Sequence, residues 1–225
     1  MNVHDAIMSR RSIRRFLPKP VPMESLRRIL EGAGRAPSGH NIQPWKAYVV
    51  AGDVKDRLSA DIVKCAREEP EENRQPEYDY YPTEWFEPFL SRRRSTGYGL
   101  YSVLGIARED RQARIDQMAR NYIFFDAPVG IFVTMNRRLA TGTYMDMGMF
   151  LENILIGARG EGLDTCGQAV FTWFHKVIRQ HVPIPDEELL ACGISIGYAD
   201  PDAPENSPFL EKLDVDDYTT FLGFD

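Results

Sequence analysis

The segment from residue 143 to residue 162, TYMDMGMFLENILIGARGEG, constrains the fold of this chain more than any other. Its apolar residues occur at helical spacing and leave almost no polar face, so the segment predicts a helix that is buried on nearly all sides. Such a helix lies at the centre of a core or at a subunit interface. The rest of the chain must therefore supply the layers that cover it.

Short strands and helices alternate around this central helix. Apolar or alternating runs predict strands, and a glycine-bounded run predicts a turn with a short extended piece. The strands are predicted at residues 46–52, 127–135 and 189–200, and the extended piece at residues 162–171. Helical spacing predicts helices at residues 2–9, 23–33, 53–69, 108–125 and 175–182. Because the strands are few and separated by helices, we expect a mixed α and β class with a central sheet flanked by helices.

Two segments show no clean helical or strand period. Residues 70–98 contain four prolines and seven aromatic residues, which predicts an ordered insertion. This insertion either clamps its own domain or a partner subunit, or acts as a substrate lid. The C-terminal extension, residues 200–225, has too many polar and proline residues to form its own core and is expected to wrap over another surface. No linker divides the chain, so we expect one domain over residues 1–225.

Charge and composition exclude several classes of function. The net charge of -6 argues against a nucleic-acid partner, which needs a positive field over a face. Three widely spaced cysteines indicate a reducing, cytoplasmic setting, and no apolar run is long enough for a membrane helix. The four histidines lack the spacing of metal ligands, so no metal site is predicted.

A cluster of arginines stands out near the N-terminus of this acidic chain. The motif RRSIRRF, residues 10–16, contains Arg10, Arg11, Arg14 and Arg15 around Ser12. Guanidinium groups bind phosphate oxygens in a bidentate manner, and a serine hydroxyl adds a neutral donor. The motif therefore suits a phosphate monoester, although a solvated basic face has the same composition.

A second polar motif follows the helix predicted at residues 23–33. The loop PSGHNIQPW, residues 37–45, contains the uncharged side chains of Ser38, Asn41 and Gln43. These side chains suit hydrogen bonds to a planar heterocycle or a ribityl chain. In the alternative interpretation, Ser38 and Asn41 only satisfy the ends of neighbouring helices.

Together, the motif RRSIRxF, the intervening helix and the motif APSGxNxQPW resemble the flavin-binding signatures of the nitroreductase family. The resemblance continues through APVGIFVTM, DMGMFLENILIGARGEGLDTCGQ and LLACGISIGYADPDAPENS, and leaves out only the insertion at residues 70–98. It is strongest to nitroaryl reductases with a long insertion there, including nitrobenzoate reductases. The resemblance implies an α+β fold with a mostly antiparallel sheet. It also implies an intertwined homodimer that binds FMN at two interfacial sites and exchanges its C-terminal tails.

The resemblance also implies a role for each matching residue. Arg10 and Ser12 would hold the FMN phosphate and ribityl chain, with the Arg11 backbone beside them, and Arg14 would lie near the pyrimidine edge of the ring. The loop of the other subunit would reach the same flavin through Pro37, Ser38, Gly39 and Asn41, supported by Gln43. A turn near the flavin N5 atom would be formed by Thr165, Cys166, Gly167 and Gln168.

One stretch departs from the family pattern. Family members of this type often read NSxRTxR near the C-terminus, where this chain reads NSPFLEK. Phe209 replaces the first arginine, and only Lys212 keeps a positive charge. Phosphate binding is therefore expected to depend more heavily on Arg10 and Lys212.

The activity implied by the resemblance is the reduction of a nitroaromatic compound to its nitroso and hydroxylamine forms, with NADH or NADPH as the electron donor. Both substrates would use one pocket in turn, which gives ping-pong kinetics. The flavin carries the chemistry, so no catalytic side chain is expected, and Cys166 is predicted to line the flavin and not to act as a nucleophile. The insertion is expected to bind a small aromatic substrate through Tyr81, Trp85, Phe86, Arg93 and Arg94.

Other functions stay open at this point. A reductive dehalogenase or an ene-reductase with the same fold, or a flavin-binding protein without turnover, fits the same motifs. The absence of a GxGxxG motif leaves the choice between NADH and NADPH open.

Overall fold

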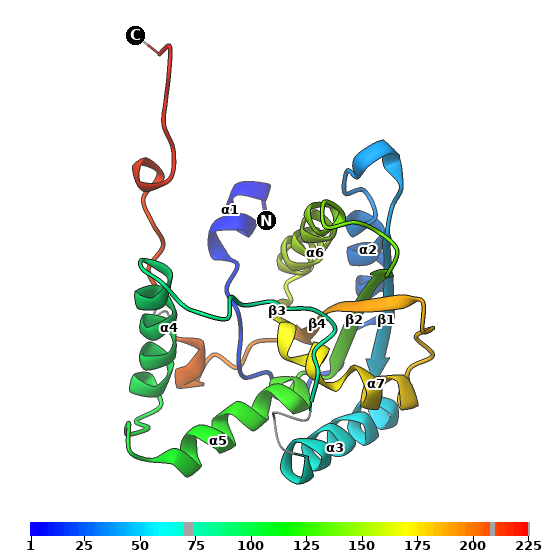
Figure 1. Ribbon diagram of the computed structural model, residues 1–225, viewed down its shortest axis with the longest axis vertical. Helices are drawn as coiled ribbons and strands as arrows, with labels where there is room; N and C mark the ends of the chain where they lie inside the picture. The colour runs from blue at the N-terminus through cyan, green and yellow to red at the C-terminus, as the bar shows by residue number, and fades with distance from the viewer. Residues whose placement is uncertain (70–73, 208–209, 225) are drawn as a thin grey trace.

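A four-stranded antiparallel sheet forms the centre of the computed structural model, which describes residues 1–69, 74–207 and 210–224 (Figure 1). The strand order is β1-β2-β4-β3, so β2 and β4 are central and β1 and β3 lie at the edges. The strands are β1 (Trp45–Ala51), β2 (Val129–Asn136), β3 (Asp164–Gln168) and β4 (Glu188–Gly197). The predicted α+β class with an antiparallel sheet is confirmed.

Helices cover both faces of this sheet. On one face α2 (Met23–Ala33) packs beside α6 (Thr143–Gly160), and α1 (Val3–Ser9) lies against α6. On the other face lie α3 (Gly52–Glu68) and α7 (His175–His181). Two further helices, α4 (Phe89–Val103) and α5 (Arg111–Ala119), lie to one side of this body in Figure 1.

The apolar run of β2 is continuous because both sides of the strand are buried. Ile131 and Val133 face the α2 and α6 layer, whereas Phe132 faces the α3 and α7 layer. On that second side two glycines make room for aromatic rings. A Cβ atom at Gly193 would lie 2.3 Å from the Phe171 ring, and one at Gly130 would lie 2.3 Å from Phe124. The close approach of these rings to the sheet therefore requires glycine at both positions.

The helix predicted from residues 143–162 is confirmed as α6. Its sheet-facing side, which includes Phe150, Ile154 and Ala158, is fully buried. On its other side Met145 and Met149 are 75% and 37% exposed. One chain therefore leaves part of the apolar surface of α6 uncovered.

The helix predicted over residues 108–125 is wrong in its second half. Helix α5 ends at Ala119, and the chain continues as an irregular 3-10 segment, Arg120–Asp126. Phe124 and Phe125 have φ angles of 56° and 55°, which a helix does not permit. The reason is tertiary packing, because the turn carries the Phe124 ring under the sheet, where it stacks on Phe171 at 4.5 Å.

The insertion contains a helix that the sequence pattern did not indicate. Its residues 70–73 lie outside the described part of the chain, residues 74–88 are mostly irregular, and α4 begins at Phe89. No residue of α4 is buried, so the helix has no apolar stripe to detect. Residues 210–224 of the tail extend away from the body in Figure 1, with Tyr218 and Leu222 exposed.

Candidate active site

The arginine motif lies along the edge strand β3. Ser12 forms a parallel bridge with Thr165, and the Ile13 amide donates to the Thr165 carbonyl at 3.0 Å. The Ile13 side chain is buried, which fixes this register. Residues 165–168, predicted as a turn, are instead part of strand β3, because they pair with β4. They and the segment at residues 10–14, both predicted as parts of a site, are neighbours in the fold.

Asn206 clamps the same segment from the C-terminal side. Its side-chain oxygen accepts from the Arg14 amide at 2.8 Å, and its side-chain amide donates to the Arg15 carbonyl at 2.8 Å. The Asn206 carbonyl accepts from Arg11 Nη1 at 2.9 Å. The sequence analysis assigned no role to Asn206, and these contacts hold the arginine motif against the start of the tail.

A small cationic cavity of about 120 Å³ lies between these two segments. Its cationic lining residues are Arg10, Arg11, Arg14 and Lys212. Ser12 and Ser207 also line it, and Glu205 is the one carboxylate among its described lining residues. Arg15 points elsewhere, since its guanidinium pairs with Asp126 at 2.8 Å. Four cations against one carboxylate suit an anion with several oxygens.

Cys166 lies beside this cavity as a buried thiol. Burial raises its pKa, and the opposing effects of Arg14, Ser12 and Arg10 do not cancel that rise. A thiol with a raised pKa is a poor nucleophile at neutral pH. Next to it, the buried Thr165 hydroxyl has no hydrogen-bond partner among the described residues.

A larger cavity of about 720 Å³ begins two residues further along β3, at Gly167. The irregular part of the insertion contributes Arg74, Tyr78 and Tyr81 to its lining, and Trp173 lies there as well. Two residues of extended chain span roughly 7 Å, so the two cavities are close neighbours along one strand. Flat aromatic side chains around a cavity of this size suit a flat ligand.

The Gln168 side chain also lines this cavity but is held by the protein. Its amide donates to the Asn121 carbonyl at 2.9 Å, and its oxygen accepts from the Ser195 hydroxyl. Gln168 is only 3% exposed. Its side chain therefore stabilises the end of β3, where Gly167 lines the cavity.

The predicted substrate-binding residues fall into two places. Tyr81 lines the larger cavity, and its ring lies 5.3 Å from the Trp85 ring, on which Arg93 stacks at 4.7 Å. Phe86 is 60% exposed and packs edge-on against another phenylalanine. Arg94 lines, together with Arg93, a separate hollow of about 230 Å³.

The loop predicted to bind the flavin of another subunit is exposed and ordered by its own contacts. The Ser38 hydroxyl accepts from the Gln43 amide at 3.0 Å, and the Gln43 side chain donates to the Asn41 carbonyl at 3.2 Å. The Gly39 amide donates to Asp146 of α6 at 3.3 Å. Neither cavity described above has a described lining residue from this loop, which also includes Pro37.

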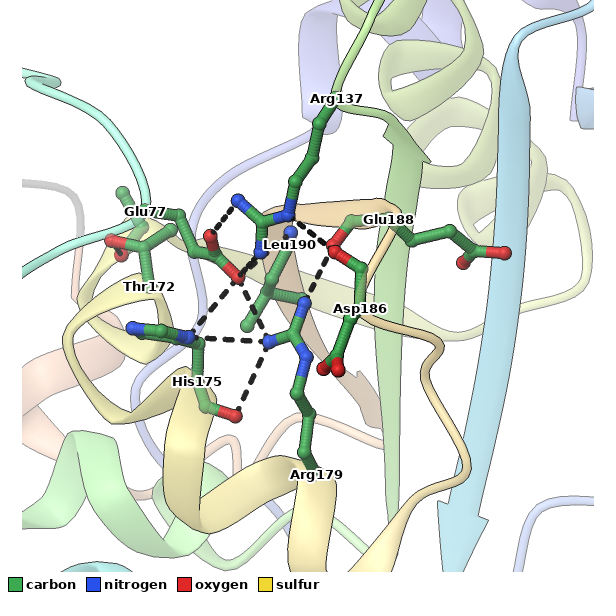
Figure 2. A network of polar contacts seen from close by, with 9 residues as sticks. Glu77, Arg137, Thr172, His175, Arg179, Asp186, Glu188 and Leu190 are labelled. Atoms are coloured by element: carbon green, nitrogen blue, oxygen red, sulfur yellow. Dashed lines mark hydrogen bonds and ion pairs between the residues drawn. The ribbon is translucent and has the colours of Figure 1, made fainter.

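A buried carboxylate fastens the insertion to the body (Figure 2). Glu77 lies 2.6 Å from Arg137 Nη1 and 2.8 Å from Arg179 Nη1, and His175 Nδ1 lies 3.2 Å away. Burial alone would raise the pKa of Glu77, but the hydrogen bond from Arg137 and the nearby cations outweigh it and lower the pKa. Glu77 directly precedes Tyr78, so this network fixes the wall of the larger cavity.

Sequence reasoning missed Glu77, Asn206 and Arg74. Each acts through contacts with segments that are distant in the chain. No local motif surrounds Glu77 or Arg74, and Asn206 begins the NSPFLEK stretch but received no role of its own. Only the aromatic density of the insertion indicated that residues near Tyr78 would line a pocket.

In the described part of the chain, no group of three or more histidine, cysteine, aspartate or glutamate side chains could hold a metal ion. None of the described helices combines the length and apolar character needed to cross a membrane.

The antiparallel sheet between two helical layers, with two cavities along its edge strand, defines an α+β protein of the nitroreductase-like fold. The sequence model of the Nitroreductase family matches residues 7–198, and the chain belongs to this family. The predicted resemblance is confirmed.

Relatives of known activity match nearly the whole chain. It is 39% identical to the nitrobenzene nitroreductase of Ectopseudomonas oleovorans, covering 98% of this chain and 96% of that protein. It is 40% identical to the 4-nitrobenzoate reductase of Nocardioides sp. (strain LMS-CY), covering 98% and 90%. The structure matches that of the FMN and NADPH-dependent nitroreductase NfnB from Sphigopyxis sp. strain HMH, with a TM-score of 0.94, 37% identity and full coverage of both chains.

Proposed function

We propose that this protein is an FMN-dependent oxidoreductase that uses NAD(P)H to reduce nitroaromatic compounds. The observation that carries the proposal is the meeting of the arginine motif, the edge strand β3 and the start of the tail around one cationic cavity, beside a large aromatic cavity. Full-length relatives with nitroaromatic substrates and an FMN and NADPH-dependent structural neighbour support the same activity.

The residues around the two cavities fit FMN. The cationic side chains of Arg10, Arg11 and Lys212 and two serine hydroxyls suit the phosphate group. The buried Thr165 hydroxyl, without a partner among the described residues, offers a further donor nearby. The larger cavity at Gly167 has the aromatic walls that suit a flat ring system. When bound there, FMN supplies hydride transfer from the nicotinamide and two-electron transfer to the nitro group.

Within this proposal each residue has a task. Arg10, Ser12 and Lys212 hold the phosphate and ribityl chain, with Arg11 fixed by Asn206. Arg14 places a positive charge near the pyrimidine edge, where it favours added electron density. The end of strand β3, from Thr165 through Cys166 and Gly167 to Gln168, offers backbone groups to the ring near N5.

We further propose that the active unit is a homodimer. The loop at residues 37–43 is exposed and distinct from both cavities of its own chain, so it suits the flavin of a second copy. The uncovered methionines of α6 and the exposed apolar residues of the tail supply surface for that copy. Light scattering after gel filtration should give twice the mass of one chain, and the monomer mass would contradict the dimer.

The insertion acts in this proposal as a substrate lid of a single domain spanning residues 1–225. Tyr81 lies in the aromatic cavity, and Trp85 with Arg93 stacks behind it. Phe86 and Arg94 are assigned to the same lid as outer contacts for an aromatic acid. The part of the insertion at residues 70–73 and the substituted position Phe209 lie outside the described residues.

An anaerobic absorbance titration tests the proposed activity. Flavin bands near ~450 nm should bleach when NADH or NADPH is added and return when a nitrobenzoate follows. A protein that is colourless and fails to take up added FMN would refute the proposal. Steady-state rates on a nitroarene, a halophenol and an enone then separate nitro reduction from dehalogenation and alkene reduction.

A further inference from the structure

A third cavity of about 600 Å³ lies between α3 and α5, and its described lining includes Tyr101 at the end of α4. Its walls include the apolar or aromatic side chains of Ile115, Met118 and Tyr101. Four arginines also line it, namely Arg67, Arg74, Arg111 and Arg114. Arg67, Arg111 and Arg114 lie outside both cavities assigned above to FMN, whereas Arg74 also lines the larger one.

Among the described residues, these four arginines lack the carboxylate partner that the arginines of the Glu77 network have. Arg137 and Arg179 share the Glu77 carboxylate, whereas none of the four forms an ion pair with any residue in the described part of the chain. Among the described lining residues Asp116 is the one carboxylate, and it already accepts from Gln112 at 2.9 Å.

Two of these guanidinium groups are partly desolvated. The Nε atoms of Arg74 and Arg114 are buried without a hydrogen-bond partner among the described residues. Arg74 is held in place by stacking on the Phe174 ring, 5.1 Å from its centroid. Buried cationic donors that lack a protein acceptor are an unfavourable arrangement unless a ligand supplies the acceptor.

The third cavity adjoins the aromatic cavity that begins at Gly167. Arg74 lines both of them, and the neighbours Asn121 and Tyr122 line one each. A long ligand can therefore have one end beside Gly167 and the other among the four arginines. A benzoate carboxylate needs only one guanidinium group. The presence of four arginines therefore favours a ligand with several negative charges.

We propose that this cavity binds the phosphorylated adenosine end of NADPH. This inference rests on the proposed function. The apolar walls accept the adenine ring, and Arg111 and Arg114 of α5 bind the 2′-phosphate. Arg74, which lines both cavities, binds the diphosphate that NADH and NADPH share. The nicotinamide end then reaches the aromatic cavity at Gly167. The site makes NADPH a better electron donor than NADH, because only NADPH carries the 2′-phosphate.

Calorimetric titration of the FMN-loaded protein with 2′,5′-ADP tests the site without turnover. Arg111→Ala and Arg114→Ala should each weaken binding by about tenfold, since each removes a charge-assisted contact with phosphate. Arg57→Ala is the matched control, because Arg57 is exposed on α3 and forms no ion pair with a described residue. Binding to this control should equal binding to the wild type.

Steady-state kinetics give the second readout. The two variants should lower kcat/KM for NADPH by about tenfold and leave kcat/KM for NADH nearly unchanged. A wild type that does not bind 2′,5′-ADP, or variants that lower both constants equally, would overturn the site. Inorganic phosphate that binds as tightly as 2′,5′-ADP would also overturn it, because adenosine recognition would then be absent.

The wild-type rate with a nitroarene separates this inference from the proposed function. If the wild type reduces nitroarenes but the variants keep their NADPH preference, only the adenosine site is wrong. If the wild type reduces none, the proposed function fails, and the titration with 2′,5′-ADP still decides whether the cavity binds the nucleotide.

Discussion

Glu77 Oε2 lies 2.6 Å from Arg137 Nη1, which joins the irregular part of the insertion to the end of strand β2 (Figure 2). The Glu77 side chain is only 2% exposed, so the carboxylate of this ion pair is shielded from water. The same carboxylate also binds Arg179 of α7. One residue therefore connects three segments that are far apart in the sequence and positions the neighbouring Tyr78 in the cavity wall.

Replacing this acid should loosen the insertion. Glu77→Gln leaves two guanidinium groups without their counter-charge, and we expect the free energy of unfolding to fall by about 3 kcal/mol. The KM for a nitroarene should rise, because Tyr78 and Tyr81 lose their fixed positions. Chemical denaturation and steady-state kinetics measure the two effects.

Glu84→Gln is the matched control for this variant, because Glu84 is an exposed acid of the same insertion with no ion pair among the described residues. It should match the wild type in both measurements. If Glu77→Gln also matches the wild type, the network does not anchor the insertion.

Acid should destabilise the fold through two buried carboxylates. Burial alone would raise the pKa of Glu77 and Glu188, but hydrogen bonds to Arg137 and Lys46, respectively, and neighbouring groups lower each pKa below the usual 4.5. A lowered pKa means that the stabilisation is complete above the unfolded value and is lost as the pH falls through the folded value. Burial also lowers the pKa of His175, so protonation of the unfolded chain adds a further loss of stability as the pH falls below the usual His pKa of 6.5.

We therefore expect the Tm to be highest near neutral pH and to fall steeply below about pH 4.5. Thermal unfolding followed by circular dichroism across this range measures the effect. Glu77→Gln should have a lower Tm at neutral pH and a shallower acid decline. An acid decline as steep as that of the wild type would mean that Glu77 does not titrate as described.

The packing of Phe171 against β4 predicts the effect of a single added methyl group. A Cβ atom at Gly193 would lie 2.3 Å from the ring, so Gly193→Ala must displace a buried aromatic side chain. Overpacking of this kind costs about 1–3 kcal/mol, which thermal unfolding would register as a lower Tm. Gly97→Ala in α4 is the control, because its added Cβ would meet no atom within 4 Å outside its chain neighbours and the α4 backbone. Equal Tm values for the two variants would contradict this packing.

Cys166 should be dispensable for chemistry. Its pKa is raised by burial, and the described residues around it provide no base within hydrogen-bond distance of the thiol. We expect Cys166→Ala to keep its FMN and to keep kcat within about twofold of wild type, whereas loss of a covalent nucleophile costs orders of magnitude. Stopped-flow reduction of the bound flavin would detect such a loss. A loss at full flavin content would show that the thiol takes part in the reaction.

The hydrophobic pattern of the sequence was sufficient to predict the elements that bury a regular apolar face or run. The apolar period of residues 143–160 and the apolar runs of β2 and β4 correspond to buried elements of the structure. The helix expected over residues 108–125 ended early because the burial of Phe124 under the sheet outweighed helix propensity. Helix α4 gave no signal because none of its residues is buried.

The candidate site likewise combines residues that a local motif reveals with residues that only long-range contacts bring together. The motif around Ser12 could be recognised from consecutive residues, and the structure adds that it lies on β3 beside Thr165. The contacts of Asn206 and Glu77 could not be recognised, although Asn206 begins the NSPFLEK stretch, because each residue acts on segments more than 50 residues away in the chain. The contacts of Asn206 with Arg14 and of Glu77 with Arg137 demonstrate this. Such long-range polar contacts leave no periodic trace in a sequence.

The arginine motif supplies a test with an internal control. Arg10 lines the cationic cavity and lies 3.7 Å from Glu152 of α6. By contrast, Arg15, five residues later, lines no part of that cavity and is paired with Asp126 at 2.8 Å. Arg10→Ala should therefore weaken FMN binding by about ten- to a hundredfold, which corresponds to the loss of a charge-assisted hydrogen bond. Arg15→Ala removes the same charge but should retain FMN, because Asp126 keeps its contact with Arg120 at 2.6 Å. Flavin absorbance after gel filtration and FMN titration of the apoprotein measure both effects. If the two variants lose FMN equally, the net charge of the motif matters and the position of Arg10 does not.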